Sequence, residues 1–148
     1  MITFRWMLVL PLLFLVAGPA SAQEMGTAAE AKAMLEKVVA DMKANKAKAL
    51  QDITAGTYNK KDLYPFVGGP DGKFTAHGAN KALVGQSLKD LKDKSGKAFG
   101  EDIYKEAQAG KVSEVSYAWP RPNETTPVPK IALFEKVGDE IVAVGYYK

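Results

Sequence analysis

The sequence predicts an α+β domain in which a long N-terminal helix packs on an antiparallel sheet of about five strands. Two observations support this prediction. Between Thr27 and Gly56, apolar residues recur at spacings of three, four and seven, which is typical of a helix with one buried face. After Gly56, glycine and proline turns separate short runs rich in aromatic and β-branched residues, which is typical of strands.

The helix begins at a recognisable signal. Thr27 and Glu30 have the spacing of a capping box, and the residues that follow are mostly strong helix formers. We expect one helix of about 25 residues that ends at Gly56. Its apolar stripe consists of Ala31, Met34, Leu35, Val38, Met42, Ala49 and Ile53.

A hairpin and a short helix should follow. Asp62–Val67 and Lys73–His77 read as two short strands joined by a glycine-rich turn. Residues 85–100 are polar and interrupted by glycines, so we expect a loop with one or two helical turns, in which Asp93 is a turn former. Glu101–Gln108 is interpreted as a short helix.

The last third of the chain predicts three antiparallel strands. Val115–Trp119 alternates apolar and small residues, and the proline-rich segment Pro120–Pro129 reads as a hairpin tip. Lys130–Val137 alternates again and ends at a turn, Gly138-Asp139. Glu140–Tyr147 is nearly all apolar, which favours a central strand buried on both faces.

The first 22 residues read as a secretory signal peptide. An apolar run of 11 residues, Trp6–Val16, follows Arg5 and is too short to span a bilayer, and Ala20-Ser21-Ala22 fits a cleavage site. We expect cleavage after Ala22, a single domain over residues 23–148, and a periplasmic or secreted location. An uncleaved amphipathic anchor is the alternative.

Composition excludes several classes of function. The chain has no cysteine, one histidine (His77), 18 lysines and two arginines, with a net charge of +3. Disulfides, thiolate sites and two-histidine zinc sites are therefore excluded, and we expect neither a metal nor another cofactor. The charge is too small to indicate nucleic-acid binding. Neither a G-x-S-x-G motif nor another nucleophile motif occurs, so we expect a protein that is not an enzyme.

Nine short pieces recur in the order of a known family. They are Tyr64–Val67, Pro70–Lys73, Thr75–His77, Leu83–Gly85, Asp93–Gly96, Ala109-Gly110, Tyr117–Trp119, Pro127–Lys130 and Gly145–Tyr147. In this order they resemble the single Cache domain family, an extracytoplasmic relative of the PAS fold, over residues 28–148. The chain departs from the family pattern at Gly78, where the family has a proline after the histidine.

The resemblance implies a stand-alone, sensor-type module that binds a small organic acid or an amino-acid-like ligand between the curved sheet and the loops in front of it. The family usually continues into a membrane helix and a signalling output. This sequence ends at Lys148, so we expect ligand occupancy to be passed to a membrane partner, without a signalling output of its own.

Lys130 is the best candidate for binding an anionic ligand, because arginine is nearly absent and Lys130 shares a strand face with Phe134. Tyr117 and Trp119 could wall the pocket, and His77 could donate or accept a hydrogen bond. The second-rank candidates are Tyr104 and Tyr146. In the alternative reading, these aromatic residues are core, Lys130 is solvated and His77 is structural. The protein is then an interaction module with a closed pocket that pairs through the N-terminal helix.

Overall fold

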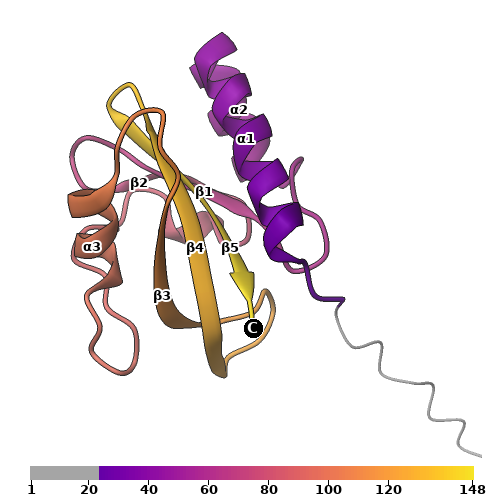
Figure 1. The fold of residues 1–148 in the computed structure, drawn as a ribbon, viewed down its shortest axis with the longest axis vertical. Helices are drawn as coiled ribbons and strands as arrows, with labels where there is room; N and C mark the ends of the chain where they lie inside the picture. The colour runs from indigo at the N-terminus through magenta and orange to yellow at the C-terminus, as the bar shows by residue number, and fades with distance from the viewer. Residues whose placement is uncertain (1–23) are drawn as a thin grey trace, which may run out of the picture.

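A five-stranded antiparallel sheet separates two unlike layers in the computed structural model, which describes residues 24–148 (Figure 1). The predicted signal peptide lies outside these residues. The helices are α1 (Ala28–Ala44), α2 (Lys46–Thr54) and α3 (Phe99–Glu106), and a 3₁₀ turn spans Lys81–Leu83. The strands are β1 (Pro65–Gly68), β2 (Phe74–His77), β3 (Ser113–Pro120), β4 (Pro127–Val137) and β5 (Glu140–Tyr147). The predicted α+β class is confirmed.

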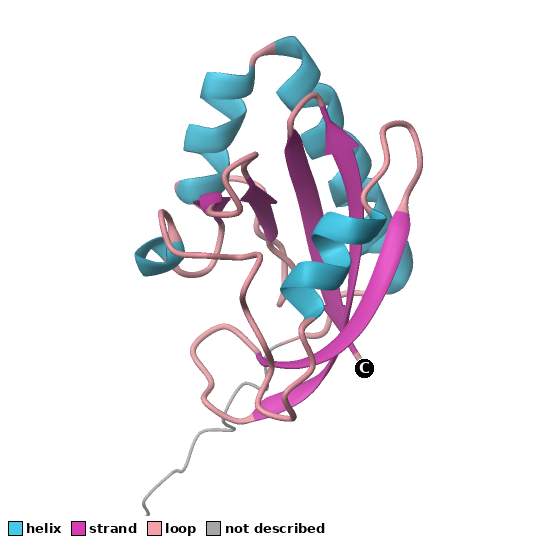
Figure 2. Cartoon of the chain, turned by 90° about the vertical axis from the view of Figure 1, so that its left-hand side faces the viewer, coloured by secondary structure: helices cyan, strands magenta, loops and turns pink. Residues whose placement is uncertain are grey.

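The sheet has the order β2-β1-β5-β4-β3, so the last strand of the chain lies at its centre. β5 pairs with β1 on one side and with β4 on the other. All but one of its eight residues are buried, as its continuous apolar run predicts. α1 and α2 cover one face of the sheet, whereas α3 and the loops before it cover the other (Figures 1 and 2).

The expected single N-terminal helix is wrong in one respect, because the structure has two helices that meet at Asn45. The backbone of Asn45 is extended, and its N–H still bonds to the Asp41 carbonyl at the end of α1. Its side chain accepts a hydrogen bond from Lys48 N at 3.1 Å and thereby caps α2. Asparagine offers the backbone this local alternative to continuing a helix. The Thr27–Glu30 capping box is confirmed.

Other boundaries also differ from the sequence-based expectation. β1 begins at Pro65, three residues after the expected start at Asp62. α3 begins at Phe99 and ends at Glu106, in each case two residues before the expected bounds, Glu101 and Gln108. The hairpin tip is shorter than expected, because β3 and β4 continue to pair as far as Pro120 and Pro127. Residues 127–129 extend beyond the end of β5, where Lys148 N donates a hydrogen bond to the Pro129 carbonyl at 3.0 Å, and on this edge no N–H of β4 is needed, so prolines fit.

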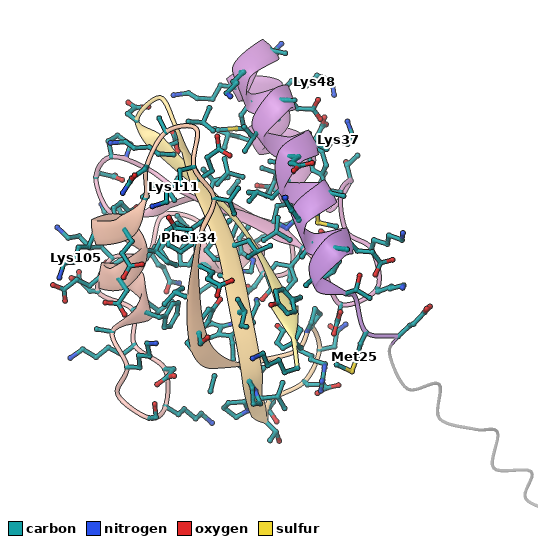
Figure 3. All side chains as sticks on the ribbon, in the orientation of Figure 1. Met25, Lys37, Lys48, Lys105, Lys111 and Phe134 are labelled. Atoms are coloured by element: carbon teal, nitrogen blue, oxygen red, sulfur yellow. The ribbon has the colours of Figure 1, made fainter. Side chains whose placement is uncertain are left out.

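Each face of the sheet has its own apolar cluster (Figure 3). On the helix face, Leu35, Val38 and Ile53 pack on Val142 and Val144 of β5. The opposite face is mainly aromatic, and its cluster comprises Tyr64, Phe66, Phe74, Leu88, Phe99, Ile103, Val115, Tyr117, Ala132, Phe134, Ile141 and Ala143. Across residues 24–148, no helix combines the length and apolar character that crossing a bilayer requires.

Candidate functional site

A small cavity lies inside the aromatic layer, between the sheet and the loop that precedes α3. Its free volume is about 10 Å³, which is room for roughly one water molecule. Strands β1 to β4, the residue before β1, the loop and the first residue of α3 supply its walls. The lining residues are Tyr64, Phe66, Phe74, His77, Leu88, Leu91, Phe99, Tyr117, Trp119 and Lys130. We call this space the inner cavity.

Lys130 places a cation in the wall of the inner cavity. The residue is 1% exposed, and its Nζ donates a hydrogen bond to Tyr64 Oη at 2.8 Å. Nζ also lies 4.2 Å from the ring centre of Tyr64 and 4.8 Å from that of Tyr147, close enough for cation–π contact. Among residues 24–148, no carboxylate oxygen lies within the 4.0 Å of an ion pair with Lys130.

The ammonium group of Lys130 is only partly satisfied. It carries three N–H donors, and among the described residues only Tyr64 accepts a hydrogen bond from it. A buried charge without an opposite charge is costly, because water no longer solvates it. The cavity therefore offers an anion both charge and unused hydrogen-bond donors.

A chain of hydroxyl groups fixes the position of Tyr64. Tyr147, which pairs with Lys130 across β4 and β5, donates a hydrogen bond to the carbonyl of Pro120 at 2.7 Å. Its oxygen lies 3.3 Å from Tyr64 Oη. Since the hydrogen of Tyr147 is already used, Tyr64 donates to Tyr147 and accepts from Lys130. Burial raises the pKa of Tyr147 far above its usual range, so its phenol stays protonated.

Gly145 provides the space that the Lys130 stem occupies. A Cβ atom at Gly145 would overlap Lys130 Cε, because the two atoms would lie closer than any van der Waals contact. Gly145 faces Ala132 across the strands, so two small residues lie beside the lysine stem. The glycine thus positions the cation without touching any ligand.

His77 is a neutral hydrogen-bond donor at the edge of the inner cavity. Its Nδ1 accepts hydrogen bonds from Ala79 N at 3.2 Å and Asn80 N at 2.9 Å, so the neutral ring carries its hydrogen on Nε2. Burial, and secondarily the charge of Lys130, lowers the pKa of His77 to about 3. Within residues 24–148, no group accepts a hydrogen bond from Nε2, which leaves this donor available.

Tyr117 and Trp119 form the aromatic wall next to Phe99. The Tyr117 ring stacks on Phe99 at 4.0 Å with an interplanar angle of 8°, and Trp119 meets Phe99 edge-on at 5.6 Å. Burial raises the pKa of Tyr117 well above its ordinary value. Neither the Tyr117 hydroxyl nor the Trp119 indole N–H hydrogen bonds to another described residue, so both polar groups remain available in the wall.

A larger cleft of about 490 Å³ adjoins the inner cavity and shares Tyr64, His77 and Trp119 with it. We call it the outer cleft. Its rim is formed by the loop between β3 and β4, by the 3₁₀ turn and by Lys92 and Lys94. The remaining lining residues are Ala79, Asn80, Leu83, Ala118, Pro120, Arg121, Pro122, Asn123, Glu124 and Pro127.

Asp93 fixes the segment that carries Lys92 and Lys94. Its Oδ1 accepts hydrogen bonds from Ser95 N, Ser95 Oγ and Lys97 N, and its Oδ2 accepts one from Ala118 N of β3 at 3.0 Å. These bonds, that of the Ser95 hydroxyl first, lower the pKa of Asp93 to about 2. The prediction that Asp93 forms a turn is confirmed.

Four of the six residues predicted from sequence come together in the structure, since Lys130, Tyr117, Trp119 and His77 all line the inner cavity. The other two lie elsewhere. Tyr104 donates a hydrogen bond to the Gly69 carbonyl at 2.8 Å and so holds α3 to the β1–β2 turn. Tyr146 packs against the cluster under α1 and α2, on the opposite face of the sheet.

Sequence reasoning missed Tyr64 and Tyr147, although the sequence contains a signal for each. The predicted turn at Gly138-Asp139 pairs Val137 with Glu140, and the same register places Tyr147, not Tyr146, opposite Lys130. Tyr64 and Phe66 are two residues apart, so they share one face of the first hairpin.

Within residues 24–148, no cluster of three or more acidic or histidine side chains has the geometry of a metal site.

Comparison with protein families gives one match. The family model described as Single Cache domain 2 matches residues 20–146. The chain belongs to the single Cache domain family. Cache domains are sensor domains that bind ligands, so this Cache domain is a ligand-sensing module. No curated protein matches the chain.

Three solved structures share the fold of this Cache domain. A methyl-accepting chemotaxis protein from Vibrio parahaemolyticus is 26% identical with a TM-score of 0.68, over 80% of this chain and 86% of that one. A periplasmic sensor domain of a chemotaxis protein is 26% identical with a TM-score of 0.62, over 79% and 87%. A Cache chemosensory domain described for carboxylic acid recognition is 22% identical with a TM-score of 0.57, over 79% and 85%.

Proposed function

We propose that this Cache domain senses a small organic carboxylate, which binds with its carboxylate group against Lys130 in the inner cavity. The observation that carries the proposal is the buried Lys130 ammonium, which has no carboxylate partner and uses one of its three donors on a described residue. A carboxylate supplies the missing charge and accepts the unused hydrogen bonds. His77 Nε2–H and the Tyr117 hydroxyl are further donors in the same wall.

The lining favours a plain carboxylic acid over an α-amino acid. No acidic side chain lines the inner cavity, so no carboxylate there would pair with the ammonium group of an amino acid, and Lys130 would repel it. Recognition of carboxylic acids is also described for one solved Cache chemosensory domain of the same fold.

The inner cavity must widen to admit a carboxylate, because its free volume corresponds to about one water molecule. Trp119 is half-buried, borders both the inner cavity and the outer cleft, and makes no hydrogen bond to a described residue. We infer that its indole ring moves aside on binding, and that the acid enters from the outer cleft with its carbon chain trailing toward that cleft.

We further propose that the predicted signal peptide exports the protein, so that the cavity samples solutes of the periplasm. The similar sensor domain of a chemotaxis protein is described as periplasmic. Cleavage after Ala22 predicts that the mature protein begins at Gln23, which N-terminal sequencing of the exported protein would verify.

The test is a calorimetric titration of the exported protein with acetate, propionate and butyrate, alongside their neutral amides. We expect the acids to bind and the amides not to bind, since an amide has no charge to match that of Lys130. Lys130→Met keeps the length of the side chain and removes its charge, and it should weaken acid binding by about 100-fold or more. Lys105→Met, which removes an exposed lysine of α3 (Figure 3), should leave binding unchanged.

Equal binding of acids and amides, or full affinity in Lys130→Met, would contradict the proposal. If neither acids nor amides bind, the interaction-module alternative takes its place. That alternative predicts pairing through α1, so light scattering after size-exclusion chromatography would then show a dimer.

A further inference from the structure

The outer cleft carries its own set of cations, distinct from Lys130. Four ionised side chains line it, of which Lys92, Lys94 and Arg121 are positive and Glu124 is negative. These four side chains give the cleft a net charge of +2 (3 − 1), which is large for one small region of a protein whose whole sequence has a net charge of +3.

Lys92 and Lys94 differ from the lysines on the helix side of the molecule. Four of the five lysines of α1 and α2 lie within 4.0 Å of a carboxylate oxygen, three of them in pairs one helical turn apart. Lys92 and Lys94 have no such neighbour among residues 24–148, although Asp93 lies between them in the sequence and Asp90 two residues before Lys92. The Asp93 carboxylate instead faces inward, onto backbone N–H groups.

Arg121 is the third cation and is held in place from several sides. Its Nε lies 3.5 Å from Oδ2 of the fully buried Asp62, and its guanidinium lies 5.3 Å from the ring centre of Tyr147. Neither Arg121 Nε nor Asp62 Oδ2 forms a hydrogen bond, and both atoms are buried. Arg121 Nη1 also lies 3.9 Å from Glu124 Oε2, so carboxylates on two sides hold the guanidinium at the cleft.

The two cationic regions lie next to each other, with shared walls between them. The inner cavity contains Lys130 and the outer cleft contains the other three cations, and both are lined by Tyr64, His77 and Trp119. Displacement of Trp119, as proposed above for ligand entry, joins the two spaces. A molecule that reaches from one to the other meets positive charge at both ends and aromatic surface between them. An acid with one carboxylate uses only the inner end.

We propose that the outer cleft is a second anion subsite, so that the preferred ligands are dicarboxylates, with one carboxylate on Lys130 and the other between Lys92, Lys94 and Arg121. This inference rests on the proposed function, because Lys130 anchors the first carboxylate. The alternative is that the outer lysines attract anions only from a distance. In that case dicarboxylates bind more tightly than monocarboxylates at low salt, because they carry more charge, and the two classes bind with equal affinity at high salt.

The experiment compares straight-chain dicarboxylates of three to six carbons with monocarboxylates of the same chain length, by calorimetry of the exported protein in 0.15 M salt. We expect one chain length to bind about tenfold more tightly than its monocarboxylate counterpart. The double variant Lys92→Gln/Lys94→Gln should lose this preference and keep its affinity for monocarboxylates. Lys105→Gln/Lys111→Gln makes the same charge change at exposed lysines outside the cleft and should retain the preference.

The outcomes separate the two proposals. Binding of monocarboxylates without any dicarboxylate preference overturns the second subsite and leaves the proposed function intact, as does a preference that both double variants lose equally. A lack of binding by either class overturns the proposed function itself. A preference that only Lys92→Gln/Lys94→Gln removes supports both.

Discussion

The β4–β5 hairpin buries one charged residue near each end. One of the two has an oppositely charged partner and the other does not. Glu140, at the turn, is 4% exposed and lies on the helix side of the sheet, where its carboxylate accepts a hydrogen bond from Thr75 Oγ1 at 2.8 Å and lies 3.5 Å from Lys46 Nζ. Lys130, at the far end, is 1% exposed and has no carboxylate partner among the described residues. The buried charge on the helix face has a partner of opposite sign within the protein, whereas the buried charge on the cavity face has none among the described residues.

Under the proposed function, this difference is the one between a structural charge and a charge that a ligand neutralises. Burying a paired charge costs little once its partner and hydrogen bonds are in place, whereas an unpaired one reduces stability. The loss of stability caused by an unpaired buried cation can be offset when an external anion binds to it. Under the proposed function, the charge on the helix face is purely structural, whereas the charge on the cavity face is the one that a bound solute neutralises.

The strongest perturbation of the cavity face that leaves the helix face intact is Gly145→Ala. The new methyl group would overlap the Lys130 stem, so we expect a loss of about 2 to 3 kcal/mol in the free energy of unfolding, together with loss of acid binding. Urea unfolding measures the first effect and calorimetry the second.

The double variant Gly145→Ala/Lys130→Ala serves as the control for this prediction. If Gly145 acts by making room for Lys130, the two changes are coupled, and the alanine at 145 costs much less once the lysine stem is gone. Additive losses of stability would show that Gly145 matters for another reason.

Acid should destabilise the protein through His77, the only histidine in the sequence. Its pKa is lowered to about 3 in the folded protein from an ordinary value of 6.5, so the unfolded chain binds a proton more readily between these values. The stability is complete above pH 6.5 and falls as the pH drops toward 3. At pH 5 the loss is about 2 kcal/mol relative to neutral pH.

Urea unfolding at pH 7 and pH 5 measures this loss, and His77→Gln should reduce the difference between the two pH values. Proton NMR of the single imidazole gives the pKa directly. Titration of His77 near 6.5 in the folded protein would mean that the ring is solvated, and the polar groups of the cavity face would then not be buried as described.

The smallest expected effect comes from neutralising the two hairpin charges one at a time. Glu140→Gln should cost about 1 kcal/mol, because it weakens hydrogen bonds and an ion pair that the folded protein already makes. Lys130→Met should cost nothing or stabilise the ligand-free protein, since it replaces an unpaired buried charge with an apolar side chain. Equal destabilisation by both changes would remove the distinction between them.

Most of the fold follows from sequence patterns, because those patterns reflect forces that act over a few residues. The capping box at Thr27, the turn at Gly138-Asp139 and the apolar run of β5 each have a local cause, and the structure contains all three. The break at Asn45 was missed since the apolar stripe continues on both sides of it, and only the competing side-chain hydrogen bond shows where α1 ends.

The site was only partly predictable, because it depends on which strands are neighbours. Lys130, Tyr117 and Trp119 could be chosen from residue type and alternation alone. Tyr64 meets Lys130 only because β5 lies between β1 and β4 in the sheet, an order that no local pattern specifies. Choosing Tyr146 instead of Tyr147 was an error of one residue, and that shift moves a side chain to the opposite face of the sheet.

The most direct measurement is a crystal structure of the exported protein soaked with the carboxylate that binds most tightly. We predict a carboxylate oxygen within hydrogen-bond distance of Lys130 Nζ, in an inner cavity widened by displacement of Trp119. An acid bound only in the outer cleft, with the Lys130–Tyr64 contact and the inner cavity unchanged, would contradict the assignment of Lys130 as the group that the ligand neutralises.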